Sequence, residues 1–273
     1  MPGCDHNCEN CSVEGCESRE IKKLEPHKST KIGKIIAIMS GKGGVGKSLV
    51  TSLSAVALAK KGYKVAIMDA DVTGPSIPKA FGLNNVLAGQ NEEGLLSVET
   101  KQYKIKVMSA NLLLEDNEAP IIWRGPLVAG FVQQLFTDVN YGELDYLLID
   151  MPPGTGDIPL TVFQSLPIDG VIVVSSPQEL VSMVVAKSVN MAKMMYVPIY
   201  GLVENMAYVK CPDCGKHIEI FGNKHFKDDV RKAGLEILAE LPIDPLLASK
   251  VDNGDIESYD VSLLDGLVDK ITK

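Results

Sequence analysis

Long hydrophobic runs are absent from this sequence. Its longest apolar stretches, such as YLLID at 146–150 and GVIVV at 170–174, fall far short of the roughly 18 to 20 residues that a membrane-spanning helix needs. The first residues, MPGCDHNCEN, contain no basic region followed by an apolar stretch, so neither a secretory signal nor a transit peptide is expected. We therefore expect a cytoplasmic protein without a membrane partner.

Positive charge is also scarce. The 273 residues include 27 Lys and Arg against 35 Asp and Glu, which gives a net charge of -8. An acidic surface repels a phosphate backbone unless its basic residues are tightly clustered. We therefore expect no nucleic-acid partner.

Cysteine is present at short, regular spacings rather than scattered. In a cytoplasmic chain such cysteines stay reduced and more often bind metal than form disulfides. Four of the six have the spacing C-x3-C-x2-C-x4-C: Cys4, Cys8, Cys11 and Cys16. Four thiolates this close can hold one iron-sulfur cluster within a single chain; a zinc site or a redox-labile disordered tail is the alternative. Because residues 1–30 hold few large apolar side chains, they are predicted to be a cysteine-rich tail and linker.

From residue 31 to residue 273 the pattern is that of one α/β domain. Short β-branched runs alternate with longer segments of helical periodicity, which predicts a mostly parallel sheet. Nearly continuous apolar strands indicate a three-layer fold in which helices cover both faces of the sheet. The runs lie at 34–39, 64–69, 105–110, 146–151, 170–176 and 199–205.

A glycine-rich loop, GKGGVGKS, follows the first predicted strand and precedes the first predicted helix. This context makes G-x-x-x-x-G-K-S a phosphate-binding loop, whose backbone N–H groups face phosphate oxygens. Lys47 would neutralise the β- and γ-phosphates of ATP, and the Ser48 hydroxyl would ligate Mg²⁺. The predicted nucleotide-binding residues are Gly41, Lys42, Gly43, Gly44, Val45, Gly46, Lys47 and Ser48.

Carboxylates follow two of the predicted strands. Asp69 and Asp71 end the run KVAIMDAD, and Asp150 ends YLLID. Because parallel strands end at one edge of a sheet, we expect these groups to meet there. Asp71 is predicted to orient the attacking water and Asp150 to hold the metal, with Asp69 as a supporting ligand. The following segment PPGTGD is predicted to be a switch loop, with Asp157 as a switch or capping residue.

The remaining two cysteines form a second candidate metal site. Cys211 and Cys214 lie in CPDCG, which offers two thiolates to one metal and leaves two ligand positions to fill. His217 or His225 could complete a zinc site within one subunit. Alternatively, the same cysteine pair of a second subunit could complete a four-thiolate [4Fe-4S] site across a two-fold axis.

Taken together, these motifs resemble the Mrp/ApbC family of iron-sulfur cluster carrier ATPases. The matching stretches are GKGGVGKS, DADVTGPSIP, IIWRGP, LLIDMPPGTGD, VENMAY and CPDCG. The resemblance implies an ATP-hydrolysing homodimer that bridges a [4Fe-4S] cluster between Cys211 and Cys214 of both subunits and delivers it to apo-proteins. It also implies that Lys42, the extra lysine of the deviant Walker A motif shared with MinD and ParA, reaches the partner's nucleotide, and that Asn205 binds the adenine, with 241–247 on the base's other side.

Two other functions remain open at this point. The first is an ATP-dependent electron-transfer reductase similar to the nitrogenase iron protein, which also bridges a cluster. The second is a positioning ATPase similar to MinD or ParA with a structural zinc site. A C-terminal apolar stripe at 263–271 could act as a membrane anchor in the second case, but Asp265 and Asp269 offset its lysines. It is therefore predicted to pack on the domain as a helix.

Overall fold

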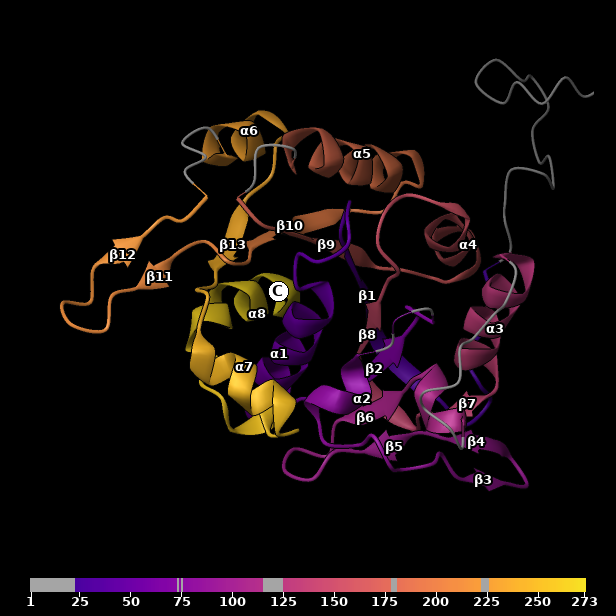
Figure 1. The fold of residues 1–273 in the computed structure, drawn as a ribbon. Helices are drawn as coiled ribbons and strands as arrows, with labels where there is room; N and C mark the ends of the chain where they lie inside the picture. Colours follow the sequence, from indigo (N-terminus) through magenta and orange to yellow (C-terminus); the bar gives the residue numbers. More distant parts are fainter. Residues whose placement is uncertain (1–22, 73, 75, 115–124, 178–180, 222–225) are drawn as a thin grey trace, which may run out of the picture.

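The computed structural model (Figure 1) describes residues 23–72, 74, 76–114, 125–177, 181–221 and 226–273. Within these residues, eight strands form one sheet in the order β13-β10-β9-β1-β8-β2-β6-β5. Its strands are β1 (Lys31–Met39), β2 (Val65–Asp69), β5 (Val98–Glu99), β6 (Lys106–Met108), β8 (Glu143–Asp150), β9 (Gly170–Ser175), β10 (Ile199–Glu204) and β13 (Ile237–Glu240). The predicted runs all lie in this sheet, whereas the sequence analysis did not find β5 and β13.

The pairings in this sheet are parallel except that between β5 and β6 at the edge. Strand β8 lies between β1 and β2, and its last residue Asp150 is in register with Ile38 on one side and Asp69 on the other. The carboxyl ends of three strands therefore lie at one level. This is the edge where open α/β sheets bind their ligands.

Helices cover both faces of the sheet, as Figure 1 shows. The helices are α1 (Lys47–Lys60), α2 (Ile77–Ala80), α3 (Gly125–Thr137), α4 (Asp157–Ser165), α5 (Val181–Met194), α6 (Phe226–Lys232), α7 (Pro245–Asp252) and α8 (Asp265–Thr272). Short 3₁₀ helices are found at Ala110–Leu113, Ile256–Ser258 and Ser262–Leu264.

Alternation along β1 divides the core into two layers. Ile36 and Ile38 pack with residues of α1, α2, α7 and α8, whereas Ile35, Ala37 and Met39 pack with residues of α3, α4, α5 and α6. Successive side chains of a strand point to opposite faces, so a strand buried on both faces must be apolar throughout. The predicted three-layer, mostly parallel α/β fold is confirmed.

The C-terminal helix α8 packs on the domain. Its side chains Leu267, Val268 and Ile271 are each fully buried in the layer beside α1. Burying a Leu, Val or Ile side chain contributes roughly 1.5 to 3 kcal/mol. The predicted packing of the C-terminal stripe is confirmed, although Leu263, just before α8, stays exposed.

Two smaller sheets and the start of the described chain complete the fold. Strands β3 (Gln90–Asn91), β4 (Gly94–Leu96) and β7 (Val139–Asn140) form one sheet, and β11 (Val209–Lys210) and β12 (His217–Ile218) form an antiparallel hairpin. Residues 23–30, the described end of the predicted linker, lie against the domain: the backbone N–H of Leu24 donates to the Ser165 carbonyl at 2.8 Å, and the Leu24 side chain packs against the core.

Candidate functional site

The glycine-rich loop lies at the carboxyl edge of the sheet, between β1 and α1. Gly44 and Gly46 have φ of 77° and 80°, which is the left-handed region that glycine adopts without a steric penalty. Gly46 is the N-cap of α1, and this 14-residue helix presents its free N–H groups and positive dipole end to the loop. The local geometry is that of a site for phosphate groups.

Lys47 and Ser48, the first residues of α1, both contact Asp150. The Lys47 ammonium lies 2.7 Å from Asp150 Oδ2, and the Ser48 hydroxyl donates to the same oxygen at 2.6 Å. Lys47 is 6% exposed and Asp150 is fully buried. The predicted phosphate-binding lysine and the predicted metal ligands are thus in direct contact.

Asp71 and Asp69 complete the acidic side of this cluster. Asp71 Oδ2 lies 3.7 Å from the Lys47 ammonium. Asp69 accepts hydrogen bonds from the backbone N–H of Asp71 at 3.1 Å and from the Ser109 hydroxyl at 3.0 Å. Burial, followed by the charge of Asp150, raises the pKa of Asp69 to about 8, so this carboxyl is largely protonated at neutral pH.

The sequence analysis did not include Thr51 or Ser109. The Thr51 hydroxyl donates to Asp150 Oδ1 at 2.7 Å and so orients the carboxylate that also contacts Lys47. Thr51 could have been found, because a residue four positions after Lys47 lies on the same face of the helix. Ser109 follows β6 and contacts Asp69 only through tertiary structure.

These oxygen groups suit a divalent cation. Mg²⁺ takes oxygen ligands and keeps several waters in nucleotide sites. The Ser48 hydroxyl and the Asp71 and Asp150 carboxylates supply such oxygens beside the phosphate loop. The donor set therefore fits the predicted magnesium.

Asn205 connects the end of β10 to the phosphate loop. Its side-chain N–H₂ donates to the Val45 carbonyl at 2.9 Å, and its backbone N–H donates to the Ser175 carbonyl at 2.7 Å. The side chain is 2% exposed, and a Cβ on Gly46 would lie 2.1 Å from its amide nitrogen. Asn205 thus holds the loop in place.

Asn205 also borders a mostly apolar pocket of about 370 Å³. Leu49 of α1 and Leu247 and Val251 of α7 line it, together with Ile243. A volume above about 300 Å³ is usual for a small-molecule site, and these walls suit a planar base. The predicted adenine contacts, Asn205 and the segment 241–247, meet in this one pocket.

The predicted switch segment lies against the phosphate loop. The backbone N–H of Gly154 donates to the Ser40 carbonyl at 2.8 Å, and a Cβ on Gly43 would lie 4.0 Å from Pro153. Asp157 is the first residue of α4, whose N-cap is Gly156. The predicted capping role of Asp157 is wrong, since its carboxylate lies in the first turn, where it interacts favourably with the helix dipole.

Lys42 lies in the loop and is half-buried, and its carbonyl accepts a hydrogen bond from the Ser40 hydroxyl at 3.0 Å. This bond fixes the backbone at the position where the deviant motif differs from an ordinary phosphate loop.

Cys211 and Cys214 lie at the end of the β11–β12 hairpin, which projects from the domain in Figure 1. The turn is closed by hydrogen bonds from the Cys211 N–H to the Lys216 carbonyl and from the Gly215 N–H to the Cys211 carbonyl, both at 2.9 Å. Cys211 is half-buried and Cys214 is exposed. Both thiols can therefore be reached from outside the domain.

Backbone N–H groups of this turn face the Cys211 sulfur. Hydrogen bonds from the backbone of Cys214 and then Asp213 lower the pKa of the Cys211 thiol below its usual value. They favour the thiolate, which is the form that binds a metal.

His217, a predicted alternative ligand, stacks on Tyr208 with ring centroids 3.8 Å apart. Among the described residues, no group of three or more His, Cys, Asp or Glu side chains is placed to hold one metal ion. His225 and the tail cysteines Cys4, Cys8, Cys11 and Cys16 lie outside the described residues. In the part of the chain that the structure describes, no helix has the length and apolar character that crossing a membrane requires.

A family model described as ParA, NUBPL iron-transfer P-loop NTPase, matches residues 31–272. The iron-sulfur cluster carrier protein of Clostridium perfringens is 47% identical over 260 residues, which cover 92% of this chain and 90% of that protein. The protein of the same name from Methanocaldococcus jannaschii is 45% identical over 263 residues, covering 93% of this chain and 90% of that protein.

Solved structures are similar as well. A nucleotide-binding protein from Archaeoglobus fulgidus, in complex with ADP, has a TM-score of 0.76 at 48% identity and covers 84% of this chain and 89% of that chain. The MinD cell division protein of Aquifex aeolicus has a TM-score of 0.61 and covers 88% of this chain and 98% of that chain. At 22% identity, this second likeness shows the fold alone.

Proposed function

The chain belongs to the ParA family of NUBPL-type iron-transfer P-loop NTPases, and from this premise we propose that it is an ATP-dependent iron-sulfur cluster carrier. In this proposal a dimer holds a [4Fe-4S] cluster between its subunits and transfers it to apo-proteins. Its relatives from Clostridium perfringens and Methanocaldococcus jannaschii carry the name iron-sulfur cluster carrier protein. The cysteine pair at the end of the hairpin, with Cys211 half-buried and Cys214 exposed, is the observation that carries the proposal.

The proposed ATP site is formed by Gly41–Ser48 together with the pocket beside Asn205. The loop's N–H groups and Lys47 would bind the phosphates, for which Lys47 exchanges its contact with Asp150 for phosphate oxygens. Ser48 and Asp150 would hold Mg²⁺, which neutralises charge on the phosphates when bound.

Hydrolysis of ATP to ADP and phosphate needs a water in line with the γ-phosphate. Asp71, 3.7 Å from the Lys47 ammonium, is the carboxylate that we assign to this water. Lys42 of the second subunit would add positive charge at the transferred phosphate, in the manner of an arginine finger. ATP hydrolysis would then depend on dimer formation.

The cluster is cargo in this proposal, held by Cys211 and Cys214 of both subunits. Four thiolates are the usual ligand set of a [4Fe-4S] cluster, and one hairpin supplies two of them at a reachable position. A two-fold axis through the cluster brings in the same pair from the second copy. Client thiolates would replace these ligands one by one, so the cluster moves intact.

The segment that runs from β10 into the hairpin links the proposed nucleotide site to the cysteine pair. Asn205 contacts the phosphate loop through Val45, and the chain then runs through Met206, with φ of 58°, to β11 and Cys211. A change at the loop therefore has a short covalent path to the thiols. This path is how nucleotide state would control cluster release.

We further propose that residues 1–30 form a cysteine-rich tail and linker to the ATPase domain at 31–273, with residues 23–30 packed on that domain, and that Cys4, Cys8, Cys11 and Cys16 bind a second cluster. We place the protein in the cytoplasm, where thiols stay reduced. Clients are expected to be proteins rather than nucleic acids, since the net charge is -8.

Anaerobic reconstitution with iron and sulfide tests this function. Two variants are compared: Cys211→Ser with Cys214→Ser, and a matched control with serine at the tail cysteines Cys4, Cys8, Cys11 and Cys16. The control should keep about four irons per dimer and transfer them to an apo-ferredoxin. The hairpin variant should lose this cluster and the transfer.

Iron and zinc analysis with an absorption spectrum reads out the result. An unchanged bridging cluster in the hairpin variant would contradict the assignment. Zinc in place of iron would indicate a structural metal site, and ATP-dependent electron delivery without iron loss would indicate a reductase.

A further inference from the structure

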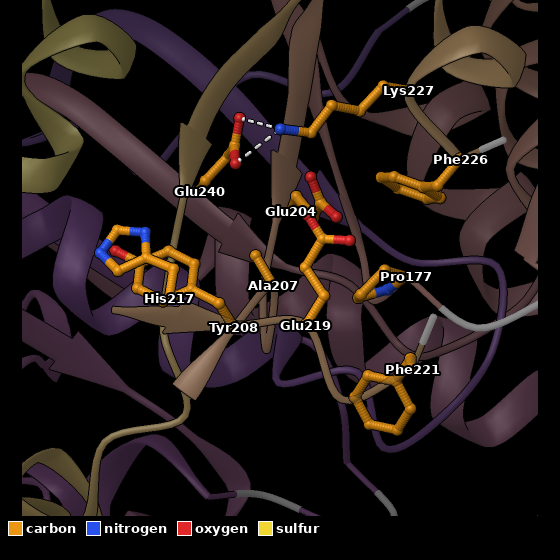
Figure 2. Close-up of a pocket in the computed structure, with 10 residues that line it drawn as sticks. All are labelled: Pro177, Glu204, Ala207, Tyr208, His217, Glu219, Phe221, Phe226, Lys227 and Glu240. Atoms are coloured by element: carbon orange, nitrogen blue, oxygen red, sulfur yellow. Dashed lines mark hydrogen bonds and ion pairs between the residues drawn. The ribbon is translucent and has the colours of Figure 1, made fainter. Parts of the chain in front are cut away.

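A cavity of about 240 Å³ lies at the base of the cysteine hairpin. Figure 2 shows its walls, which come from the ends of β10 and β13, from the hairpin and from α6. Three carboxyl groups line it, each from a different element: Glu204 ends β10, Glu219 follows β12, and Glu240 ends β13. The cavity is separate from the nucleotide pocket, which lies beside Asn205.

Glu204 is buried in this cavity without a hydrogen-bond partner for one oxygen. It is 4% exposed, and among the described residues no donor reaches its Oε2 atom. Buried polar groups of folded proteins are almost always hydrogen-bonded, so such a group calls for a ligand or a function. The Glu219 carboxyl group lines the same cavity (Figure 2), and its charge acts on Glu204.

Lys227, the lysine that lines the cavity, forms its ion pair with Glu240 and not with Glu204. The Lys227 ammonium lies 2.8 Å and 2.9 Å from the two oxygens of Glu240. Within the part of the chain that the structure describes, no lysine or arginine forms an ion pair with Glu204 or Glu219, although the charge of Lys227 acts on both. The lining carries an excess of negative charge that attracts a cation.

Aromatic rings form much of the rest of the walls, together with Pro177 and Ala207. Tyr208 is stacked on His217, and Phe221 and Phe226 lie on the opposite side in Figure 2. Ring faces attract ammonium and guanidinium groups and also bind an apolar stem. Such walls supply no oxygen ligands to a hydrated metal ion.

We propose that this cavity binds an organic cation, a primary ammonium or guanidinium group on a short apolar stem. The cationic group donates hydrogen bonds to Glu204 Oε2 and to Glu219, and the stem lies between Tyr208 and Phe226. A divalent metal suits the cavity less well, because it needs several oxygens at about 2.0 to 2.6 Å. The described residues hold no group of three or more ligands placed for one metal.

The cavity adjoins residues of both the proposed nucleotide site and the cysteine hairpin, so a cation bound in it acts on both. Glu204 directly precedes Asn205, which contacts the phosphate loop, and Glu219 belongs to the hairpin that carries Cys211. A cation that joins Glu204 to Glu219 therefore ties the hairpin to β10. The inference concerns a separate ligand and holds whether or not the protein carries a cluster.

Calorimetric titration of the full chain with n-butylammonium and n-butylguanidinium tests the proposal. Both cations should bind saturably, whereas n-butanol, a neutral molecule of similar shape, should not bind. Glu204→Gln keeps the shape of the side chain and should weaken binding of the cations about tenfold or more, since a charge-assisted hydrogen bond is lost. Glu92→Gln, which removes an exposed carboxylate elsewhere, should bind like the parent.

The pH dependence provides a second readout. Burial, together with the charges of Glu240 and Glu219, raises the pKa of Glu204 to about 7, against the opposing effect of Lys227. Binding of n-butylammonium should therefore weaken as the pH falls from 8 to 6, because Glu204 takes up a proton. The Glu204→Gln variant should lose most of this pH dependence. Its thermal unfolding temperature should stay close to that of the parent, which shows that the variant is folded.

Several outcomes would overturn the proposal: equal binding of n-butanol, unchanged binding of the cations by Glu204→Gln, or Mn²⁺ binding that depends on Glu204 when neither cation binds. A peptide with one lysine separates two sources of the cation. Tighter binding of this peptide than of n-butylammonium would support a side chain of a partner protein. Weaker binding would support a free amine.

Discussion

At the scale of single residues, Asp69 is a titratable group in an environment very different from water. It is fully buried beside Asp150, and its two oxygens accept hydrogen bonds from Asp71 and Ser109. Burial and the neighbouring charge raise its pKa from 3.8 to about 8. The folded protein therefore holds a proton here that the unfolded chain has released at neutral pH.

This proton predicts how stability depends on pH. Because the folded state binds the additional proton between pH 4 and 8, the free energy of unfolding should fall as pH rises through this range, by at most about 1.4 kcal/mol per pH unit. Asp69→Asn removes the titration. Its amide oxygen can accept from the Asp71 N–H, and its N–H₂ donates to the Ser109 hydroxyl oxygen where the parent's second oxygen accepts, so the variant should gain stability relative to the parent at pH 8. Urea unfolding at pH 5 and pH 8 measures the difference.

Asp252→Asn serves as the control, because Asp252 is an exposed carboxylate, 68% accessible. Its pH dependence should match that of the parent. If Asp69→Asn lost stability at pH 8, the buried carboxyl would have to be ionised in the folded protein.

At the scale of elements, Gly46 allows the phosphate loop to pack closely against the end of β10. Gly46 has φ of 80°, and a Cβ there would lie 2.1 Å from the amide nitrogen of Asn205. The loop therefore needs glycine at this position for two reasons. The backbone angle is left-handed, and the side chain of Asn205, which follows β10, lies too close to leave room for a Cβ. Together these requirements hold the N–H groups of the loop in place for phosphate.

Gly46→Ala should therefore impair nucleotide binding as well as stability. Gly62→Ala is the matched control, since Gly62 has φ of 93° and a Cβ there would meet nothing within 4 Å. Both variants should lose about 1 to 2 kcal/mol of stability from backbone strain. Only Gly46→Ala should lose ADP affinity as well, about tenfold or more, as calorimetric titration would measure.

Equal ADP affinities for the two variants would mean that the contact between Asn205 and Val45 has no part in shaping the loop.

At the scale of the whole molecule, the proposed dimer makes both ATP hydrolysis and cluster binding depend on the association of two subunits. Lys42 would complete the partner's ATP site, and Cys211 and Cys214 would complete the partner's cluster site. Lys42→Ala should therefore leave ATP binding intact and lower hydrolysis by about 10³-fold or more, as loss of an arginine finger does. Lys101→Ala, which removes an exposed lysine, should hydrolyse ATP at the parent's rate.

Mixing two impaired variants, at an ATP concentration too low to fill the Gly46→Ala site, tests the exchange between subunits. Lys42→Ala keeps an intact nucleotide site, and Gly46→Ala keeps Lys42 but binds nucleotide poorly. A mixed dimer has one complete site, so phosphate release should reappear when the variants are combined. No recovery would show that Lys42 acts within its own subunit.

Short-range chemistry was predictable from the sequence. The glycines and Lys47 of the phosphate loop, the apolar strands and the cysteine spacing each depend on neighbours in the chain, so GKGGVGKS, YLLID and CPDCG could be interpreted alone. The likeness to cluster carriers also followed from these motifs. Edge strands β5 and β13, of two and four residues, were missed because glutamates interrupt the sequence there, so that neither strand lies in a long apolar run as the equally short β6 does.

Only the tertiary structure decided which distant residues share one environment. Asn205 meets the phosphate loop, Ser109 meets Asp69, and Glu204 and Glu219 line one cavity, because strands far apart in sequence end at one edge of the sheet. Burial and pKa depend on that packing, since they are set by surrounding atoms rather than by neighbours in the chain. The sequence thus determined the segments that are proposed to bind phosphate and metal, and the fold decided how these segments are joined and where the carboxylate of Glu204 is buried without a partner for one oxygen.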